Sequence, residues 1–351
     1  MPSPERPLDR LLSRPCFSRR LDVVDSHTCG QPTRVVLSGH GLPAGMDPAT
    51  ARDLLRRERD WVRTVSVTEP RGHRSMFSVA LIHPAEDGGE FGAVFMDAAT
   101  YPDMCGHAII GTATTLLELG LVAPPHAGFS GAFEFGLRTP SGRIALRARL
   151  EDGRCKAVSF AFDGAWYLGG FDIALPGAGA VTVDVAYAGQ WYAFVPVSVT
   201  GAAIDAGHIG ALVAAAAPVR EALAERMAAA APAGGTLPVV GNIVWTGLPS
   251  HPEARQRNVP ISAAGAFDRS PCGTATCARM AVLVAKGGLA IGESFVNEGL
   301  LGTIYRGLPK SETSVSGQSA IVAEVEGSAW ISGCGTLLID DADPLGEGYL
   351  T

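Results

Sequence analysis

Short apolar and β-branched runs, each bounded by glycine, proline or aspartate, recur along the chain and predict β-strands. In the first half the expected strands are residues 21–25, 33–37, 77–82, 91–97, 132–135, 143–150 and 157–162. In the second half they are residues 181–186, 192–199 and 241–245. This pattern predicts a protein in which extended segments surround a few helices.

Helical patterns occur in two other places. Residues 53–67 set Leu54, Leu55 and Trp61 among arginines, which predicts a helix. Residues 209–232 are rich in alanine and are interrupted by Pro218, so we expect a helix or a helix pair packed on the surface. The first twenty residues contain five arginines and several prolines, and we expect them to form a flexible arm.

Two cysteine segments resemble each other at a spacing close to half the chain. They read YPDMCGHAIIG from residue 101 and DRSPCGTATCAR from residue 268. Asp103 and Ser270, two positions before the cysteines, are good helix N-caps, and Pro271 fits a first helical position. A glycine stands fifteen positions after each cysteine, where a helix would end. We therefore expect Cys105 and Cys272 each in the first turn of a buried helix.

That placement has chemical consequences. The first turn of a helix carries unpaired N–H groups and a partial positive charge, so it attracts anions. A thiol there often has its pKa lowered to about 3.5–7.5, which predicts thiolate near neutral pH. Two such helices could hold one carboxylate between them, with a sulfur on either side of the adjoining carbon. The alternative is two buried structural cysteines, and the matched context of the two segments favours the catalytic interpretation.

The two cysteine segments resemble the signature segments of the proline racemase family. That family includes proline racemases, 4-hydroxyproline 2-epimerases and trans-3-hydroxy-L-proline dehydratases. Further matching segments are DSHT from residue 25, PTR from residue 32, EPRGH from residue 69 and FVNE from residue 295. The resemblance extends from about residue 21 to about residue 310.

The resemblance implies an α+β fold like that of diaminopimelate epimerase. Two pseudo-symmetric α/β halves would each wrap a barrel-like sheet around a central helix, with the active site in the cleft between them. We expect the arm at residues 1–20, the first half at 21–155 and the second half at 156–319. The tail, about residues 320–351 and including 329–339, would return to complete the first half.

The resemblance also implies the site residues. Cys105 and Cys272 would be the two acid/base groups. His107 would bond to the substrate carboxylate or to the opposite thiol, and Asp268 would meet the substrate ammonium. Backbone N–H groups for the carboxylate would come from Gly106, Gly273 and Thr274. Phe77 is a candidate wall for the substrate ring.

Some residues depart from the family pattern without removing a catalytic group. Ala275 replaces the second glycine of the usual Cys-Gly-Thr-Gly-Thr, and the usual His-Thr-Gly-Gly-Glu loop contains Cys29 and Gln31 instead. Cys29 and Cys277 are interpreted as small buried residues rather than as reactive thiols.

The function that we expect is a cofactor-independent racemase or epimerase of proline or 4-hydroxyproline. One alternative is a trans-3-hydroxy-L-proline dehydratase, although relatives with that activity often lack one cysteine. Another is a non-catalytic amino-acid-binding protein, which would need neither thiol. The Cys-Gly-Asn-Gly and Glu-Arg-Gly segments of diaminopimelate epimerase do not occur. A zinc site lacks the usual ligand spacing; its candidate ligands would be Cys105, His107, Cys272 and Cys277.

The composition limits the kinds of partner and cofactor that we expect. A net charge of −7 with scattered basic residues argues against a nucleic-acid partner. Only three lysines occur, and none is a good Schiff-base candidate, so pyridoxal phosphate is not expected. Seven cysteines without a CxxC pair favour a reducing cytoplasm. No stretch resembles a signal peptide or a membrane span. We expect a small-molecule substrate and a possible homodimer.

Overall fold

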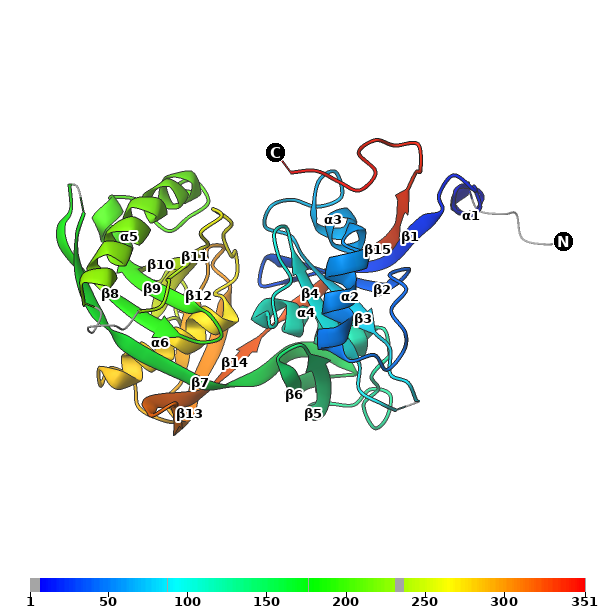
Figure 1. The fold of residues 1–351 in the computed structure, drawn as a ribbon. Helices are drawn as coiled ribbons and strands as arrows, with labels where there is room; N and C mark the ends of the chain where they lie inside the picture. Colours follow the sequence, from blue (N-terminus) through cyan, green and yellow to red (C-terminus); the bar gives the residue numbers. More distant parts are fainter. Residues whose placement is uncertain (1–6, 87, 176, 231–236, 351) are drawn as a thin grey trace.

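The computed structural model describes residues 7–86, 88–175, 177–230 and 237–350. Among these residues, fifteen strands form one continuous sheet that curls around two helices and gives the molecule two lobes (Figure 1). The long strand β7 (Arg154–Leu175) runs through both lobes. The fold class is therefore the expected mixed α/β arrangement of two similar halves, built as curled strands rather than as regular barrels.

The first lobe is an open curl of strands around helix α4 (Gly106–Glu118). The last strand pairs antiparallel with the first, so Arg19 lies opposite Ile339. Helix α4 packs against β1, β2, β3, β7 and β15. The strands that complete this lobe with β7 are β15 (Ala329–Ile339), β1 (Arg19–Thr28), β2 (Gln31–Ser38), β3 (Phe77–Ile82), β4 (Gly92–Asp97), β5 (Gly131–Thr139) and β6 (Gly142–Glu151).

The second lobe is a closed ring of strands around helix α6 (Gly273–Ala285). Strand β14 pairs with β7 as well as with β13, which closes the ring. Helix α6 packs against β7, β8, β9, β13 and β14. The strands that follow β7 are β8 (Gly179–Tyr187), β9 (Trp191–Pro196), β10 (Asn242–Gly247), β11 (Gln256–Ile261), β12 (Phe295–Glu298), β13 (Ile304–Val315) and β14 (Gln318–Gly327).

Helices α4 and α6 have the same length and the same kind of end. Almost all of α4 is buried, as a helix without a charged face must be. Gly120 follows α4 with φ 68°, and Gly287 follows α6 with φ 71°. This left-handed conformation suits glycine, so the predicted helix ends are confirmed.

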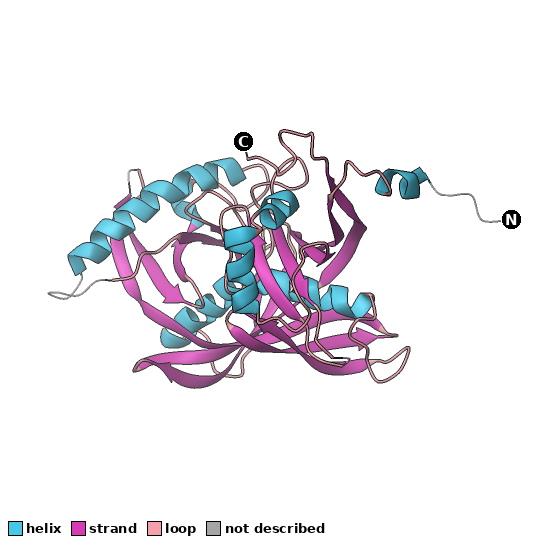
Figure 2. Ribbon diagram, turned by 45° about the vertical axis from the view of Figure 1, so that its right-hand side comes forward, coloured by secondary structure: helices cyan, strands magenta, loops and turns pink. Residues whose placement is uncertain are grey.

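The remaining helices lie on the outside of the sheet. They are α1 (Pro7–Leu12), α2 (Pro48–Glu58), α3 (Trp61–Val67), the 3₁₀ turn η1 (Val197–Thr200) and α5 (Ile209–Ala230). Helix α5 is continuous through Pro218 and packs against β7 and β10, and it forms the long helix in Figure 2. The last residues of the alanine-rich run, 231 and 232, lie outside the described residues.

Some of the predicted boundaries are wrong. The single helix expected at 53–67 is two helices, because Arg59 leaves the helical region with φ −140°. The first of them begins at Pro48, where Asp47 accepts a hydrogen bond from the backbone N–H of Thr50 at 3.0 Å. The expected arm at 1–20 contains α1 and the first two residues of β1.

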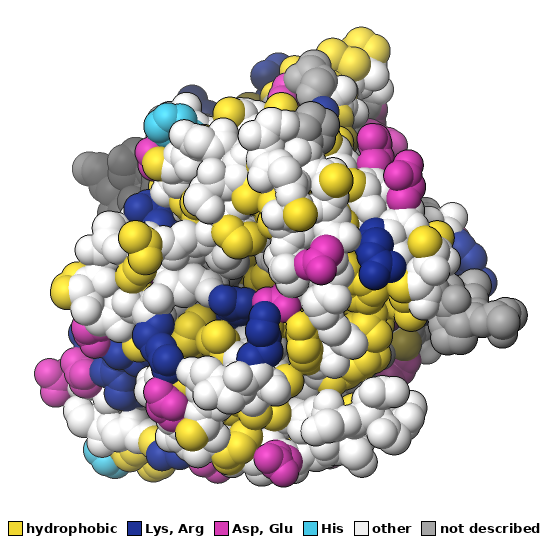
Figure 3. Space-filling view, turned by 90° about the vertical axis from the view of Figure 1, so that its left-hand side faces the viewer, with side chains coloured by type: hydrophobic (Ala, Val, Ile, Leu, Met, Phe, Trp, Pro, Cys, Tyr) yellow, Lys and Arg dark blue, Asp and Glu magenta, His cyan; other side chains and the backbone are white. Residues whose placement is uncertain are grey.

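The other predicted strands occur where they were expected, but some of them differ in length from the prediction. The strand expected at 157–162 is part of the 22-residue β7. The strand expected at 192–199 ends at Pro196, where the chain turns into η1. Basic and acidic side chains are interspersed over the face that the second lobe presents (Figure 3). No helix among the described residues is long and apolar enough to cross a membrane.

Candidate active site

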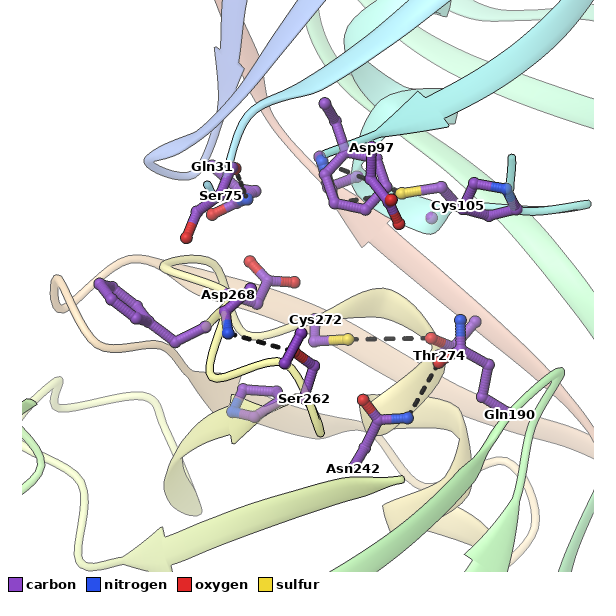
Figure 4. A pocket seen from close by; sticks show the side chains of 18 of the residues that line it. Gln31, Ser75, Asp97, Cys105, Gln190, Asn242, Ser262, Asp268, Cys272 and Thr274 are labelled. Carbon is purple, nitrogen blue, oxygen red and sulfur yellow. Dashed lines mark hydrogen bonds between the residues drawn. The ribbon is translucent and has the colours of Figure 1, made fainter. Parts of the chain in front are cut away.

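A cavity of about 410 Å³ lies between the two lobes and is lined by both. All seven residues predicted for the site line it, and so does Phe77. Cys105 stands on one wall, and Cys272, Asp268 and Thr274 stand on the opposite wall (Figure 4). The fold thus brings the two cysteine segments to one place.

The cysteines cap the helices rather than lying inside the first turn. The carbonyls of Cys105 and Cys272 accept the first intrahelical bonds, from Ile109 and Thr276, each at 2.9 Å. The predicted N-caps are therefore wrong by two positions, because Pro271 and Met104 still belong to the loops. The N–H groups at the start of both helices have no intrahelical acceptor, and Gly106, His107, Gly273 and Thr274 of these first turns line the cavity.

Asp103 and Ser270 have other partners. The exposed Asp103 carboxylate pairs with Arg52 of α2. The Ser270 hydroxyl accepts a hydrogen bond from the N–H of Cys272 at 3.1 Å and donates one to Asp268 at 2.8 Å. Ser270 therefore links the second cysteine to the carboxylate beside it.

The two helices touch at a pair of glycines. A Cβ added to Gly106 would lie 3.3 Å from the Cα of Gly273 and 3.1 Å from the ring of Phe160 on β7. A Cβ on Gly273 would meet the Cα of Gly106 at 3.4 Å. Glycine at both positions therefore lets the two positive helix ends come together, where one anion can contact both.

Cys105 lies against the histidine of its own helix. The Cys105 sulfur is 3.3 Å from Nδ1 of His107, whose ring meets Phe77 edge-on with centroids 4.6 Å apart. Burial lowers the pKa of His107 to about 3, so the imidazole is neutral. In the structure this side chain contacts the thiol of its own helix; the expected partners were the substrate carboxylate or the opposite thiol.

Cys272 has a different neighbourhood. Its sulfur lies 3.8 Å from the hydroxyl oxygen of Thr274, which is hydrogen-bonded to the Tyr192 hydroxyl at 2.6 Å. Its backbone has φ 63°, a left-handed conformation that costs a non-glycine residue energy. The two thiols therefore stand at equivalent helix positions but have unlike partners.

The prediction of depressed thiol pKa values is wrong for this structure. Burial raises the pKa of Cys105 well above its ordinary range, and burial together with the Asp268 carboxylate raises that of Cys272 to about 12. The N–H groups of Ala108 and Ala275 act in the opposite direction but are outweighed. Desolvation of a buried thiolate exceeds the helix contribution here.

Asp268 directs its carboxylate into the gap between the lobes (Figure 4). It accepts hydrogen bonds from the backbone N–H and the hydroxyl of Ser270, both at 2.8 Å. Burial raises the pKa of Asp268 to about 6, so the group is mostly ionised at neutral pH. A charge held in this position suits an ammonium group.

Several lining residues were missed by sequence reasoning. Tyr192 and Asn242 lie on predicted strands, where an aromatic or a lone amide gives no functional signal. Asn242 donates to the Gln190 side chain at 2.9 Å. Gln31, noted only as a departure, donates to the Ser75 carbonyl at 2.8 Å and accepts from the Arg269 N–H at 3.0 Å, which bridges the lobes. Other lining residues are Arg74, Asp97, Pro260, Ser262, Phe267 and Leu350.

Cys29 and Cys277 are buried, as expected. The thiol of Cys277 points to the Ala323 carbonyl at 3.9 Å and does not line the cavity. Cys29 contacts the Ile304 carbonyl at 3.5 Å. In the described part of the chain, no group of three His, Cys, Asp or Glu side chains is placed to hold a metal ion.

The sequence is similar to known enzymes over nearly its whole length. A profile described as proline racemase matches residues 23–350. Proline racemase of Clostridioides difficile is 36% identical over 335 residues, covering 95% of this chain and 99% of the relative. A 4-hydroxyproline epimerase of Brucella ovis is 35% identical over 327 residues, covering 93% and 97%.

Solved structures agree with the sequence matches. A hydroxyproline epimerase from Agrobacterium vitis, with bound trans-4-hydroxy-L-proline, superposes with a TM-score of 0.79 at 25% identity and 95% coverage of both chains. A PhzF-family phenazine biosynthesis protein of Bacillus anthracis, with a TM-score of 0.61 and 14% identity, shares the fold alone. With its two cysteine-capped helices meeting at one cavity, the chain belongs to the proline racemase family.

Proposed function

We propose that the protein is a cofactor-independent isomerase that inverts the α-carbon of 4-hydroxyproline or proline, with Cys105 and Cys272 as its two acid/base groups. The observation that supports this most is the meeting of two cysteine-capped helix ends across one cavity. None of the relatives named above is a dehydratase or a binding protein, which were the alternatives.

In this mechanism the substrate carboxylate binds at the paired helix ends. It would accept hydrogen bonds from the N–H groups of Gly106, His107, Gly273 and Thr274. One sulfur, as thiolate, removes the α-proton from one face, and the other, as thiol, returns a proton to the opposite face. The helix ends stabilise the negative charge that develops on the carbanion and carboxylate.

The raised thiol pKa values fit a site completed by its substrate. A buried thiolate is costly unless a positive charge stands nearby. The substrate ammonium, held by Asp268, would bring that charge into the cavity. Because the two thiols share one site, their titrations are coupled, and apparent pKa values belong to the pair.

The cavity favours a hydroxylated ring over proline itself. Gln190, Asn242 and Ser262 place amide and hydroxyl groups on the lining of the second lobe. Each of these side chains keeps hydrogen-bonding capacity beyond its bonds within the protein, which a 4-hydroxyl can use and an apolar ring edge cannot, and sites that bond a substrate hydroxyl discriminate strongly. We therefore propose 4-hydroxyproline as the better substrate.

Proton NMR in D₂O tests the proposal. The enzyme is incubated separately with trans-4-hydroxy-L-proline, L-proline and trans-3-hydroxy-L-proline. We expect the α-proton signal to disappear and the epimer to appear, fastest with the 4-hydroxy compound. A dehydrated product from the 3-hydroxy compound alone would identify a dehydratase, and no exchange with any compound would overturn the proposal.

We further propose two halves: a first at residues 21–155 completed by the returning tail, and a second that begins at residue 156. Because β14 (Gln318–Gly327) closes the ring of the second lobe, the tail that completes the first half starts after residue 327 rather than at about residue 320. A homodimer in a reducing cytoplasm is also proposed. Two observations support the reducing compartment and the homodimer: all seven cysteines are free, and Trp330 and Ile331 of the edge strand β15 are 51% and 41% exposed. Sedimentation velocity would measure the oligomeric state.

A further inference from the structure

The two thiols differ in the polar groups that face them. Cys105 has the neutral His107 ring, which can accept or donate according to its tautomer. Cys272 has the pair of hydroxyl groups of Thr274 and Tyr192. The second pair includes Tyr192 of strand β9, which lies outside both cysteine segments.

The number of protons on this hydroxyl pair shows that one of them is left to bond to a group outside the pair. Two hydroxyls carry two protons, and the 2.6 Å bond between them uses one. The other proton has the Cys272 sulfur as its neighbouring acceptor, 3.8 Å from the Thr274 oxygen. A hydrogen bond to Cys272 from either hydroxyl lowers the pKa of its thiol.

Tyr192 is well suited to remain a donor. Its side chain is only 3% exposed, and burial raises the pKa of its phenol well above the ordinary value. The phenol therefore keeps its proton in the pH range in which the thiols would act. A buried hydroxyl of this kind needs a partner, and the chain Tyr192–Thr274–Cys272 supplies one.

We propose that Tyr192, acting through Thr274, is a positioning residue that holds a hydroxyl proton on Cys272 and so makes Cys272 the more readily ionised thiol of the pair. The Asp268 carboxylate opposes ionisation of both thiols, so it does not by itself distinguish them. Cys105, beside the neutral imidazole, is then the thiol that keeps its proton more firmly. This inference rests on the proposed acid/base role of the two cysteines. It adds a chemical difference between the half-sites that the matched segments alone do not predict.

The test measures each thiol without turnover. Full-length enzyme is alkylated with iodoacetamide over a range of pH, and modification of the Cys105 and Cys272 peptides is followed separately by mass spectrometry. In the wild type we expect Cys272 to react at lower pH than Cys105. Tyr192→Phe removes the bond that holds the Thr274 hydroxyl in place beside Cys272. It is expected to slow alkylation of Cys272 about tenfold near neutral pH, the size of one hydrogen bond, and to leave Cys105 unchanged.

Three further measurements make the result decisive. Tyr167→Phe, whose hydroxyl donates to Asp184 at 2.7 Å, is the matched control and should leave both rates unchanged. Thr274→Ser keeps the hydroxyl and should retain the wild-type rate for Cys272. An unchanged Cys105 rate in Tyr192→Phe guards against a folding defect in that variant. The pH profile of kcat/KM should shift in Tyr192→Phe.

The outcomes separate this inference from the proposed function. If the wild type inverts hydroxyproline but Tyr192→Phe leaves the alkylation profile of Cys272 unchanged, the positioning role is overturned and the two-base proposal stands. If the profile shifts but no substrate is inverted, the hydroxyl pair is supported and the proposed function fails.

Discussion

At the scale of single residues, the site depends on groups whose ordinary ionisation is changed by burial. Both cysteines, His107 and Asp268 lie in one cavity and have shifted pKa values. Such clusters are typical of functional sites. Three predictions concern individual side chains.

The first prediction concerns the two thiols. Cys105→Ser and Cys272→Ser replace a thiol by a hydroxyl that is far harder to ionise, so each should lower the rate of inversion about 10²–10⁴-fold, as loss of a general acid or base does. Steady-state polarimetry or chiral chromatography measures the rate. The exposed Cys334 provides the control, since Cys334→Ser should retain full activity. Near-normal inversion by either site variant would refute the two-base assignment.

The second prediction concerns Asp268. Its carboxyl has a pKa of about 6 in the folded protein and gains a proton as the pH falls through that value. If the charge binds the substrate ammonium, kcat/KM should decrease below about pH 6, mainly through KM. Asp268→Asn should have a low kcat/KM at every pH and should not show this decrease at acid pH (the acid limb of the profile). An unchanged acid limb in Asp268→Asn would assign the limb to another group.

The third prediction concerns stability in acid. Burial lowers the pKa of His40 to about 4, from an ordinary 6.5, so the folded state holds this side chain neutral. Between these values the unfolded chain binds more protons, and stability should therefore fall as the pH drops from about 6.5 to about 4, by up to about 3 kcal/mol for one such group. Urea unfolding at several pH values measures this. His40→Gln should reduce the slope, whereas the exposed His126→Gln should not.

At the scale of elements, the distance between the two helix ends is set by the glycine pair. Helices α4 and α6 touch at Gly106 and Gly273, with Phe160 of β7 packed below both. The space at this point is tight: a methyl group on Gly106 would require the Phe160 ring or the opposite backbone to shift by a few tenths of an ångström. The geometry of the sulfur pair therefore depends on residues that carry no side chain.

The fourth prediction follows from that contact. Gly106→Ala should displace the helix ends by a few tenths of an ångström and reduce inversion up to about 100-fold, as small misplacements of reacting groups do. Gly273→Ala, whose added methyl group would meet its nearest neighbours at 3.4 Å, should reduce inversion less. Gly210 in α5 has open space around its Cβ position, so Gly210→Ala should leave activity unchanged. Wild-type activity in both site variants would show that the spacing of the helices is not critical.

Of the segments that match the family, some line the cavity and others hold the surrounding structure in place, and the sequence alone does not separate the two. Asp25 and Arg34 form a two-armed ion pair at 2.7 and 2.9 Å, and Arg34 also donates to the Arg71 carbonyl at 2.8 Å. Glu298 accepts the N–H groups of Ser250 and His251 at 2.6 and 2.9 Å. These matched residues hold loops and strands in place and do not line the cavity.

At the scale of the whole molecule, the lobes are not independent. Strand β7 belongs to both curls, and one apolar core contains residues of α4, α6 and β7 together. Gln31 adds a hydrogen-bonded link from the first lobe to the Arg269 backbone of the second.

The fifth prediction is a single cooperative unfolding transition. Because one lobe cannot unfold without exposing the shared strand and core of the other, the calorimetric and van't Hoff enthalpies should agree. Differential scanning calorimetry of the full chain measures both. Two resolved transitions, or a calorimetric enthalpy well above the van't Hoff value, would contradict it.

Much of this architecture could be predicted from the sequence. Apolar runs placed most of the strands, and the repeated cysteine context placed both central helices. Three features of the structure could not be predicted from the sequence. The length of β7 depends on pairing with strands far along the chain. The raised thiol pKa values depend on burial, which local helix arguments omit. Tyr192 joins the site only because the fold brings β9 beside α6.

The unlike neighbours of the two sulfurs have a consequence for the equilibrium that such an enzyme maintains. Mirror-image substrates have the same free energy in water, so with proline the reaction must end with equal amounts of the two forms. A site whose halves differ chemically cannot change that end point. It can only bind one hand more tightly and convert it more slowly, and bind the other more loosely and convert it faster. Progress curves begun from the two enantiomers should therefore differ in shape yet reach the same final mixture.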